Sequence, residues 1–291
     1  MNKIKTVAVI GAGTMGRGIA YAALVGGFRT ILQDVSERAL EQGVAYIHKS
    51  LDEGVERGKV AAEVGKAARG LLSTSPSVEE AGRAADLIIE AVPEDIRLKI
   101  ELFTLLDRAA PPHAILASNT SSLSVTEMAA VTSRAPRVAG MHFFNPVPKM
   151  RLIELIRATE TSDETLDACR EVGRRMGKEV VTVRESPGFV TSRINALIGN
   201  EAFYMLEAGV ASARDIDTAL KLGLNHPMGP FEMVDLVGLD VRLSILEYLH
   251  GTLGEKFRPC PLMIQYVKDG RLGRKAGRGV YDYPGAGASK K

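Results

Sequence analysis

The sequence predicts an α/β domain with a mostly parallel sheet over residues 1–185, followed by an all-α domain over residues 186–291. Short apolar runs alternate with longer segments rich in Ala, Glu, Lys and Leu in the first part, as in successive βαβ units. Beyond residue 185, apolar residues recur at helical spacing, and only a weak strand pattern returns, at 280–283. A length of 291 residues is also typical of two domains.

Seven extended runs are the expected strands of the first domain. The first reads TVAVI at Thr6–Ile10, and its continuous apolar character is typical of a strand that is buried on both faces. The remaining runs lie at 30–34, 87–92, 114–117, 137–143, 151–156 and 180–184. Helices are expected between them, the first at 15–25, because these segments are rich in strong helix formers.

In the second domain, Ser and Pro residues mark the expected helix starts. Ser186 and Pro187 open an apolar-periodic stretch that continues to about residue 206, with Ser as the N-cap and Pro at the first helical position. Ser212 and Pro230 begin the second and third helices, and a fourth is expected at 262–269.

Composition and charge exclude several classes of protein. Hydrophobic residues make up 45% of the chain and charged residues 25%, which excludes an intrinsically disordered protein. The 37 basic and 35 acidic side chains give a net charge of +2, which gives no reason to expect binding to nucleic acid or to a membrane. No apolar run approaches the ~20 residues that span a bilayer, and no targeting peptide is expected before the first strand. Cys169 and Cys260 predict neither a disulfide framework nor a metal site, so we expect a cytoplasmic, metal-independent protein.

A glycine-rich loop directly after the first strand predicts a Rossmann-like dinucleotide site. Gly11, Gly13 and Gly16 spell G-x-G-x-x-G between a strand and an Ala-rich helix. Gly11 allows the tight turn, Gly13 allows a pyrophosphate to approach the backbone, and Gly16 allows close packing of helix and strand. The N-terminus of the helix then offers free N–H groups to the phosphates. The alternative is a glycine-rich turn that serves packing alone.

Asp34, at the end of the second expected strand, favours NAD as the cofactor. A carboxylate at this position accepts hydrogen bonds from the ribose hydroxyls and repels the 2′-phosphate of NADP. Arg38 lies close behind in the sequence and keeps NADP open as an alternative.

The segment MHFFNPVPKMRLIELI, at 141–156, carries a candidate catalytic pair. His142 ends a strand at the sheet edge where open α/β sheets bind ligands. Two prolines predict a turn after it, and Glu154 shares one face of the next extended run with two aliphatic residues. An unpaired buried carboxylate is costly, so we expect His142 to be its partner. Such an imidazole can take a hydroxyl proton as hydride leaves, while the carboxylate orients it. A structural pair, or a solvent-facing Glu154, is the alternative.

These residues and several longer segments resemble the L-3-hydroxyacyl-CoA dehydrogenases, and look most like the short, single-function 3-hydroxybutyryl-CoA dehydrogenases. The matching segments run from residue 9 to residue 283 and read VIGAGTMGRGIA, ILASNTSSLSVTE, GMHFFNPVPKMRLIELI, SPGFVTSRI, NHPMGPFEMVDLVGLD and GRKAGRGVYDY. HFFNP followed by Glu154, together with NTSS and HPMGP, is far more specific than the glycine loop. The resemblance implies reversible, NAD-dependent oxidation of an (S)-3-hydroxyacyl-CoA, and a homodimer formed through the helical domain.

The resemblance also implies roles for individual residues. The implied catalytic residues are His142, Glu154, Ser121 and Ser192, where Ser121 contacts the substrate and Ser192 stands at the usual Asn of the family's G-F-x-x-N-R segment. The implied CoA-binding residues are Ser50, Arg57 and Lys59, with Ser121 at the reacting end; the family has Lys at the position of Arg57, and either cation can meet a phosphate. The expected cofactor site comprises Gly11, Gly13, Thr14, Met15, Gly16, Asp34, Glu94, Lys99, Asn119, Ser121, Asn145 and Lys275.

Two other functions remain as alternatives. A weak CoA site would favour a relative that oxidises a free hydroxy acid or sugar acid. A non-catalytic NAD-binding or structural relative is disfavoured by the intact set of His142, Glu154 and Ser121. The apolar stretch at 233–241, expected as a helix, is consistent with a dimer of helical domains.

Overall fold

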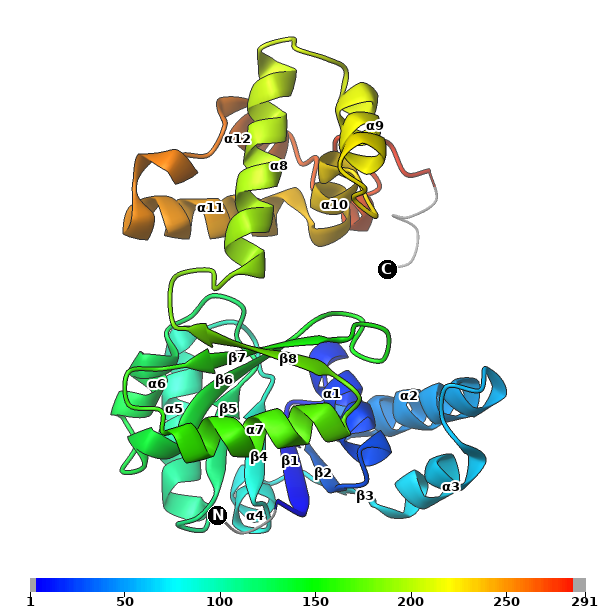
Figure 1. The fold of residues 1–291 in the computed structure, drawn as a ribbon, viewed down its shortest axis with the longest axis vertical. Helices are drawn as coiled ribbons and strands as arrows, with labels where there is room; N and C mark the ends of the chain where they lie inside the picture. The colour runs from blue at the N-terminus through cyan, green and yellow to red at the C-terminus, as the bar shows by residue number, and fades with distance from the viewer. Residues whose placement is uncertain (1–3, 285–291) are drawn as a thin grey trace. The chain divides into compact units, whose positions relative to one another are not determined.

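The structure is a computed structural model that describes residues 4–284. The chain divides into two compact units, Met1–Ser186 and Pro187–Lys291. Figure 1 shows a sheet with helices in the first unit and packed helices in the second. The α/β class with a helical second part is therefore confirmed.

An eight-stranded sheet forms the centre of the first unit, in the order β3-β2-β1-β4-β5-β6-β7-β8. All neighbouring strands are parallel except β6 and β7, which are antiparallel. The strands are β1 Thr6–Ile10, β2 Arg29–Gln33, β3 Leu72–Ser75, β4 Leu87–Glu90, β5 Ile115–Ser118, β6 Val138–Phe143, β7 Leu152–Arg157 and β8 Glu179–Arg184. The seven expected strands are confirmed within one or two residues at most ends. Strand β3 (LSTS) was missed because it is short, polar and half exposed.

Helices connect the strands of the first unit. They are α1 Thr14–Val25, α2 Glu37–Glu56, α3 Ala62–Gly70, α4 Val78–Arg83, α5 Ile96–Ala109, α6 Val125–Ala130 and α7 Asp163–Arg175, with the short 3-10 turn η1 Ala135–Arg137. Side-chain caps begin several of them, such as Ser36 at α2 and Asp95 at α5, which satisfy N–H groups of the first turn. Apolar residues of α1 and α7 pack with those of the central strands in one core.

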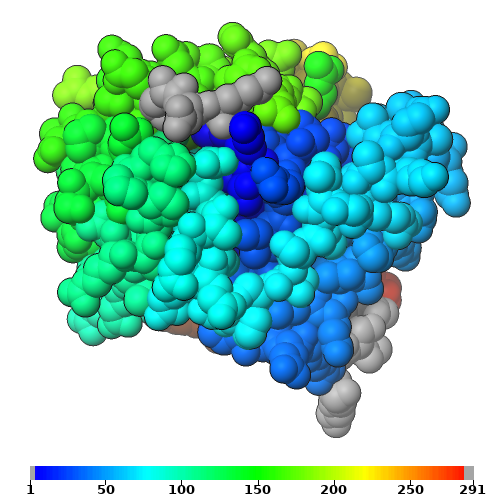
Figure 2. Space-filling view, turned by 90° about the horizontal axis from the view of Figure 1, so that it is seen from below, coloured from blue at the N-terminus to red at the C-terminus, as the bar shows by residue number. Residues whose placement is uncertain are grey.

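The strand order places ligand-binding loops at one edge of this sheet. The chain moves from β1 outward to β3 and then returns to β4 on the other side of β1, so the order reverses between β1 and β4. Crevices at the carboxyl ends of strands beside such a reversal bind ligands in open α/β sheets. Figure 2 shows the opposite face, at the amino ends, with the start of the chain in dark blue. There Asp86 accepts hydrogen bonds from the amides of Lys5 and Thr6, which ties β4 to β1.

The second unit contains helices and short 3-10 turns among its described residues. The elements are α8 Thr191–Glu207, α9 Ala213–Gly223, α10 Pro230–Val237, α11 Leu239–Leu253, η2 Glu255–Phe257, α12 Pro261–Lys268 and η3 Arg274–Ala276. Their core includes Phe203 and Phe231, whose rings meet edge to face with centroids 5.2 Å apart. Ser212 caps α9 and Pro230 lies at the start of α10, so these two helix starts are confirmed.

Two expectations for the second unit were wrong. The first helix begins at Thr191 and not at Pro187, because Gly188 and Phe189 have φ angles of 72° and 49° that a right-handed helix does not allow. The stretch 233–241 is two helices, broken at Gly238, whose φ is 108°. The weak strand pattern at 280–283 corresponds to no strand, in agreement with the all-α prediction; Asp282 takes part in an isolated bridge with Arg278.

Candidate active site

The glycine loop follows β1 and leads into α1. Gly11 has a φ of 100°, and a Cβ built there would lie 2.9 Å from the carbonyl oxygen of Ala91. A Cβ on Gly16 would lie 1.7 Å from the carbonyl oxygen of Gly11, so this helix could not approach the strand with any larger residue. Gly13 is the N-cap residue of α1, and a Cβ built on it would have no other atom within 4 Å. The loop therefore leaves open space beside the N-terminus of α1, as a bound pyrophosphate requires.

Asp34 connects this loop to the start of α2. It follows β2 directly, and its Oδ2 accepts a hydrogen bond of 2.9 Å from the amide of Ala12. Its Oδ1 accepts one of 2.9 Å from the amide of Ser36, the N-cap of α2. The two amides hold the carboxylate in one orientation at the carboxyl edge of the sheet. Arg38 is exposed in the first turn of α2.

His142 and Glu154 are directly opposite each other in the antiparallel pair of β6 and β7. His142 Nδ1 lies 2.8 Å from Glu154 Oε2. The carboxylate is fully buried and the imidazole is 7% exposed, so the pair is shielded from water. The Phe144 ring packs on the imidazole with centroids 4.4 Å apart. Since Nδ1 faces the carboxylate, Nε2 is the ring nitrogen on the side away from Glu154.

Asn119 joins the loop after β5 to the strand that carries His142. Its backbone N–H donates to the carbonyl oxygen of Glu90 over 2.8 Å, and its side-chain Oδ1 accepts from the backbone N–H of Phe143 over 2.8 Å. The loop after β5 and the end of β6 are thereby fixed together. Ser121, two residues further along this loop, is partly exposed. Asn145 is exposed in the turn that follows β6.

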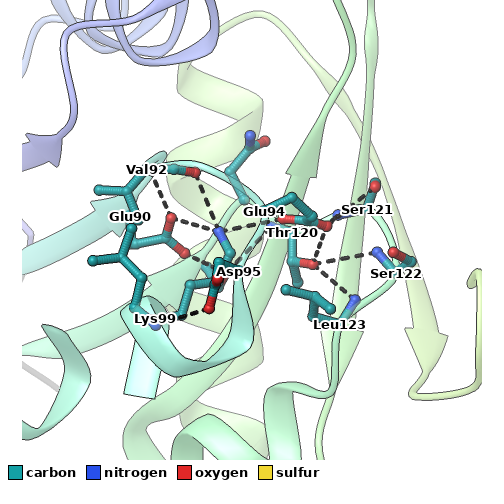
Figure 3. A network of polar contacts seen from close by, with 12 residues as sticks. Glu90, Val92, Glu94, Asp95, Lys99, Thr120, Ser121, Ser122 and Leu123 are labelled. Carbon is teal, nitrogen blue, oxygen red and sulfur yellow. Dashed lines mark hydrogen bonds and ion pairs between the residues drawn. The ribbon is translucent and has the colours of Figure 1, made fainter. Parts of the chain in front are cut away.

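Glu94 and Lys99 form a polar network with the same loop (Figure 3). Glu94 Oε1 accepts hydrogen bonds from the hydroxyls of Thr120 and Ser121. Lys99 is only 1% exposed, and its ammonium group contacts Glu90 at 2.6 Å and Glu94 at 3.3 Å. The family resemblance implies that Lys99 lines the cofactor site; within the first unit its ammonium group contacts these two carboxylates and the carbonyl oxygen of Val92.

A pocket of 410 Å³ lies between α1, α2 and the turn after β6. The three expected CoA-binding residues Ser50, Arg57 and Lys59 all line it. Four other cations in its wall were missed from the sequence. Lys49 directly precedes Ser50, whereas Lys149, Arg151 and Lys178 come from segments distant in the chain. Glu53 is the acidic residue in this wall, and it pairs with Arg57 at 3.4 Å. The wall therefore carries a strong excess of positive charge.

Lys178 fixes the turn that follows His142. Its Nζ donates hydrogen bonds to the carbonyl oxygens of Val147 and Met150, at 2.5 and 2.7 Å. The side chain is 9% exposed, and burial lowers the pKa of Lys178 to about 8. A buried ammonium group bound to backbone carbonyls thus holds the turn between β6 and β7.

Ser192 and Lys275 belong to the second unit. Ser192 lies in the first turn of α8 and is partly buried. Lys275 Nζ forms an ion pair of 2.6 Å with Asp240, at the start of α11. The Lys275 ammonium group holds the pKa of Asp240 below its usual range against the opposing effect of desolvation.

Over residues 4–284, no three His, Cys, Asp or Glu side chains are grouped so that they could hold a metal ion. Within the same range, no helix has both the length and the apolar character required to cross a membrane.

A glycine loop at the reversal of strand order, an acidic residue after β2 and a buried His–Glu pair define a nicotinamide-dependent dehydrogenase of the Rossmann class. Comparison with known families agrees. Residues 6–186 match the NAD binding domain of 3-hydroxyacyl-CoA dehydrogenase, and residues 188–283 match its C-terminal domain. The chain belongs to the 3-hydroxyacyl-CoA dehydrogenase family, which confirms the resemblance, the enzyme class and NAD as the cofactor.

Individual relatives are similar over their whole length. The chain is 49% identical to a probable 3-hydroxybutyryl-CoA dehydrogenase of Bacillus subtilis, covering 97% of this chain and 98% of that one. It is 42% identical to the mitochondrial hydroxyacyl-coenzyme A dehydrogenase of Rattus norvegicus, covering 96% and 91%. The crystal structure of (S)-3-hydroxybutyryl-CoA dehydrogenase from Ralstonia eutropha superposes with a TM-score of 0.93 at 45% identity, covering 97% and 99%.

Proposed function

We propose that this protein catalyses the reversible, NAD-dependent oxidation of (S)-3-hydroxybutyryl-CoA to acetoacetyl-CoA. The observation that carries the proposal is the buried contact of 2.8 Å between His142 Nδ1 and Glu154 Oε2. The names of the Bacillus and Ralstonia relatives support the short acyl chain. Oxidation of a secondary alcohol requires a group that takes the hydroxyl proton, and an imidazole held by a carboxylate is suited to that step.

In the proposed mechanism, His142 Nε2 takes the proton of the 3-hydroxyl group. Glu154 keeps the ring in one orientation and stabilises the imidazolium ion that forms. Bound NAD would supply the acceptor for the hydride from carbon 3 of the substrate. Ser121 donates a hydrogen bond to the reacting oxygen. In the reverse direction, the His142 imidazolium ion returns the proton to the oxygen of the 3-oxo group.

The residues present fit NAD. The open space beside Gly13 and the N-terminus of α1 suit a pyrophosphate. Asp34, whose Oδ2 accepts from the Ala12 amide of the same loop, would accept hydrogen bonds from the ribose hydroxyls. From the family resemblance, the further proposed cofactor contacts in the first unit are Thr14, Met15, Glu94, Lys99, Asn119, Ser121 and Asn145.

The CoA moiety is proposed to bind in the pocket lined by Ser50, Arg57 and Lys59. Its excess of cations suits phosphate groups, which form charge-assisted hydrogen bonds with Arg and Lys. A free hydroxy acid would leave this positive wall unused, so the pocket favours the thioester over the alternative substrates.

Further parts of the proposal concern the second unit and the assembly. Ser192 is proposed to contact the substrate and Lys275 the cofactor, as the family resemblance implies. A homodimer through the helical domain and a cytoplasmic location complete the proposal. Cys169 and Cys260 are both buried free thiols, as is usual in a reducing compartment.

Oxidation of NADH by acetoacetyl-CoA, followed by absorbance, tests the proposed function. We expect turnover with acetoacetyl-CoA and a kcat/KM at least ~100-fold lower with acetoacetate, because the free acid makes no contact in the CoA pocket. His142→Gln is the matched control, since it removes the proton acceptor and leaves the glycine loop unchanged. Preference for the free acid would support the alternative substrate class. Binding of NADH without turnover of either compound would indicate a non-catalytic protein.

A further inference from the structure

The turn between β6 and β7 forms one wall of the pocket that is proposed to hold CoA. Lys149 and Arg151, in and directly after this turn, both line the pocket. The expected CoA-binding residues belong to α2 and to the loop that follows it: Ser50, Arg57 and Lys59. The pocket therefore carries cations on two separate segments of the chain, and a polyphosphate that enters it can meet both.

Lys149 and Arg151 have no counter-charge within residues 4–284. Both residues are exposed, and neither side chain forms a hydrogen bond or an ion pair with another residue of this range. By contrast, Lys49 and Arg57 of the other wall lie 4.0 and 3.4 Å from the carboxylate of Glu53. A phosphate group that binds to the cations of the turn thus competes with no internal carboxylate, and it gains charge-assisted hydrogen bonds.

Hydrogen bonds to backbone carbonyl groups give this turn its shape. The backbone N–H groups of Lys149 and Met150 both donate to the carbonyl oxygen of Pro146, over 2.9 and 3.0 Å. The carbonyl oxygens of Val147 and Met150 both accept from the ammonium group of Lys178, over 2.5 and 2.7 Å. One buried cation thus joins the carbonyl groups on either side of Lys149, so it restricts the backbone that carries the exposed Lys149 side chain.

The segment that begins at Lys178 also fixes the residue after the turn. The backbone N–H of Glu179 donates to the carbonyl oxygen of Arg151 over 2.7 Å, and β7 and β8 pair in parallel from this point on. On its other side the turn packs on α1, where a Cβ built on Gly18 would lie 2.9 Å from the Cβ of Val147. The turn is therefore held between α1 and the start of β8, and its two cations line the pocket.

We propose that Lys149 and Arg151 bind phosphate groups of the CoA substrate from the turn after β6, and that Lys178 is the positioning residue that holds this turn at the pocket. The inference rests on the proposed function, because it names further residues that recognise the same thioester. It makes the preference for CoA over a thioester without phosphates depend on a segment outside α2. Ammonium and guanidinium groups both suit phosphate oxygens, which is the chemistry that the turn would recognise.

The decisive experiment compares acetoacetyl-CoA with S-acetoacetyl-N-acetylcysteamine, a truncated thioester that lacks every phosphate group. The measured quantity is the ratio of kcat/KM for the two substrates. Lys149→Ala and Arg151→Ala should each lower this ratio ~3- to 10-fold, as for loss of a charge-assisted contact at an exposed site. The loss should appear in the KM for acetoacetyl-CoA and not in kcat. An unchanged ratio in the double variant Lys149→Ala with Arg151→Ala would overturn the proposal.

Lys178→Met tests the positioning role. We expect it to lower the ratio ~3-fold or more in the otherwise wild-type protein, but less than ~2-fold further in the double variant Lys149→Ala with Arg151→Ala, because residues that act through the same groups are not additive. Equal losses in the two backgrounds would show that Lys178 does not act through these cations. If Lys178→Met folds poorly, the exposed variants at 149 and 151 still decide whether the turn binds phosphate.

Arg134→Met is the matched control for loss of a shielded cation. The Arg134 guanidinium also donates to backbone carbonyl oxygens of the first unit, at residues outside the pocket: Asp107, Ala110 and Pro111. We expect Arg134→Met to lower Tm and to leave the ratio unchanged. A fall of the ratio in this control as large as in Lys178→Met would indicate a general loss of stability and would contradict the positioning role.

NADH affinity is a variable in these assays and not a control. The turn begins next to Asn145, a proposed cofactor contact, so the Kd for NADH is measured for every variant and both thioesters are assayed at saturating NADH. Since the ratio compares two substrates of one variant at the same saturation, a change in cofactor affinity cancels.

Calorimetric titration with CoA itself separates this inference from the proposed function. In the double variant Lys149→Ala with Arg151→Ala, the Kd for CoA should rise ~10-fold or more and should depend less on ionic strength, with Lys66→Ala as the exposed control. If this loss is seen but wild type fails to turn over acetoacetyl-CoA, the proposed function is wrong and the inference stands. Turnover by wild type with an unchanged Kd for CoA in the double variant would retain the function and overturn the inference.

Discussion

His142 and Glu154 face each other across the antiparallel strands β6 and β7, with Nδ1 and Oε2 2.8 Å apart. The turn between the strands brings the two residues into register. Because Glu154 is fully buried, its carboxylate is shielded from water and depends on the protein groups around it, His142 among them. The pair is therefore expected to act as one unit in proton transfer.

Substitution of either His142 or Glu154 should lower kcat, and the two losses should not add. His142→Gln should lower kcat by ~10²–10⁴-fold, the usual cost of losing a positioned general base, with the Kd for NADH little changed. Glu154→Gln should also lower kcat, because the ring loses its orienting partner. The double variant should be little slower than His142→Gln alone. Steady-state kinetics on the three proteins measures the coupling, and additive losses would show that the residues act separately.

Asp34 is expected to set the preference for NADH over NADPH. Asp34→Ala should raise the KM for NADH by roughly tenfold or more, the cost of losing hydrogen bonds to a charged group, and should reduce the penalty against NADPH. Since the carboxylate also accepts from the amides of Ala12 and Ser36, a modest decrease in Tm is expected as well. A wild-type enzyme that prefers NADPH would contradict this role of Asp34.

Cations of the pocket between α1, α2 and the turn after β6 are expected to bind CoA phosphates. Arg57→Ala should raise the KM for acetoacetyl-CoA several-fold, by about 1 kcal/mol at an exposed site, and should weaken the dependence of KM on ionic strength. The KM for NADH should not change. Lys66→Ala is the matched control, because Lys66 is an exposed cation of α3 outside this pocket. Equal effects of the two substitutions would indicate a general charge effect.

Ser192 tests the departure from the family pattern. Ser192→Ala should lose a hydrogen bond worth ~0.5–1.5 kcal/mol, a few-fold to about tenfold in kcat/KM, and Ser192→Asn should keep activity. Asn195 follows one turn further along α8. Asn195→Ala would lower kcat/KM as much as Ser192→Ala only if the Asn195 side chain compensates for the shorter Ser192. Unaltered kinetics in both alanine variants would remove the start of α8 from the site.

Lys178 should make stability depend on pH. Its pKa is about 8 in the folded protein against an ordinary 10.5, so between these values the unfolded chain binds more protons than the folded one. The free energy of unfolding should therefore rise with pH across this window in wild type more than in Lys178→Met. Urea unfolding at a series of pH values measures the difference, with Lys66→Met as an exposed control. Parallel curves for wild type and Lys178→Met would contradict the lowered pKa.

Much of the first unit could be predicted because its determinants are local. Continuous apolar runs predicted seven of the eight strands, and the spacing of Gly11, Gly13 and Gly16 predicted the loop after β1. Strand β3 escaped prediction because its pairing with β2 supplies the stability that its polar sequence lacks. In the second unit, helix starts at Ser212 and Pro230 were clear, but the positive φ angles at Phe189 and Gly238 depend on surrounding packing.

The sequence by itself determined the fold class, the family, the cofactor and the pairing of His142 with Glu154. Each of these depends on residue types at short spacing or on similarity to the family over most of the chain. Only the tertiary structure decided what Lys99 and Lys178 contact. Lys99, in the first turn of α5, meets Glu90 at the end of β4 and Glu94 in the loop between β4 and α5. Lys178 meets the turn after β6 because β7 and β8 are neighbours. A lysine in a sequence indicates a solvated cation, and only the oxygen atoms that folding brings around it determine whether it is buried and what it holds.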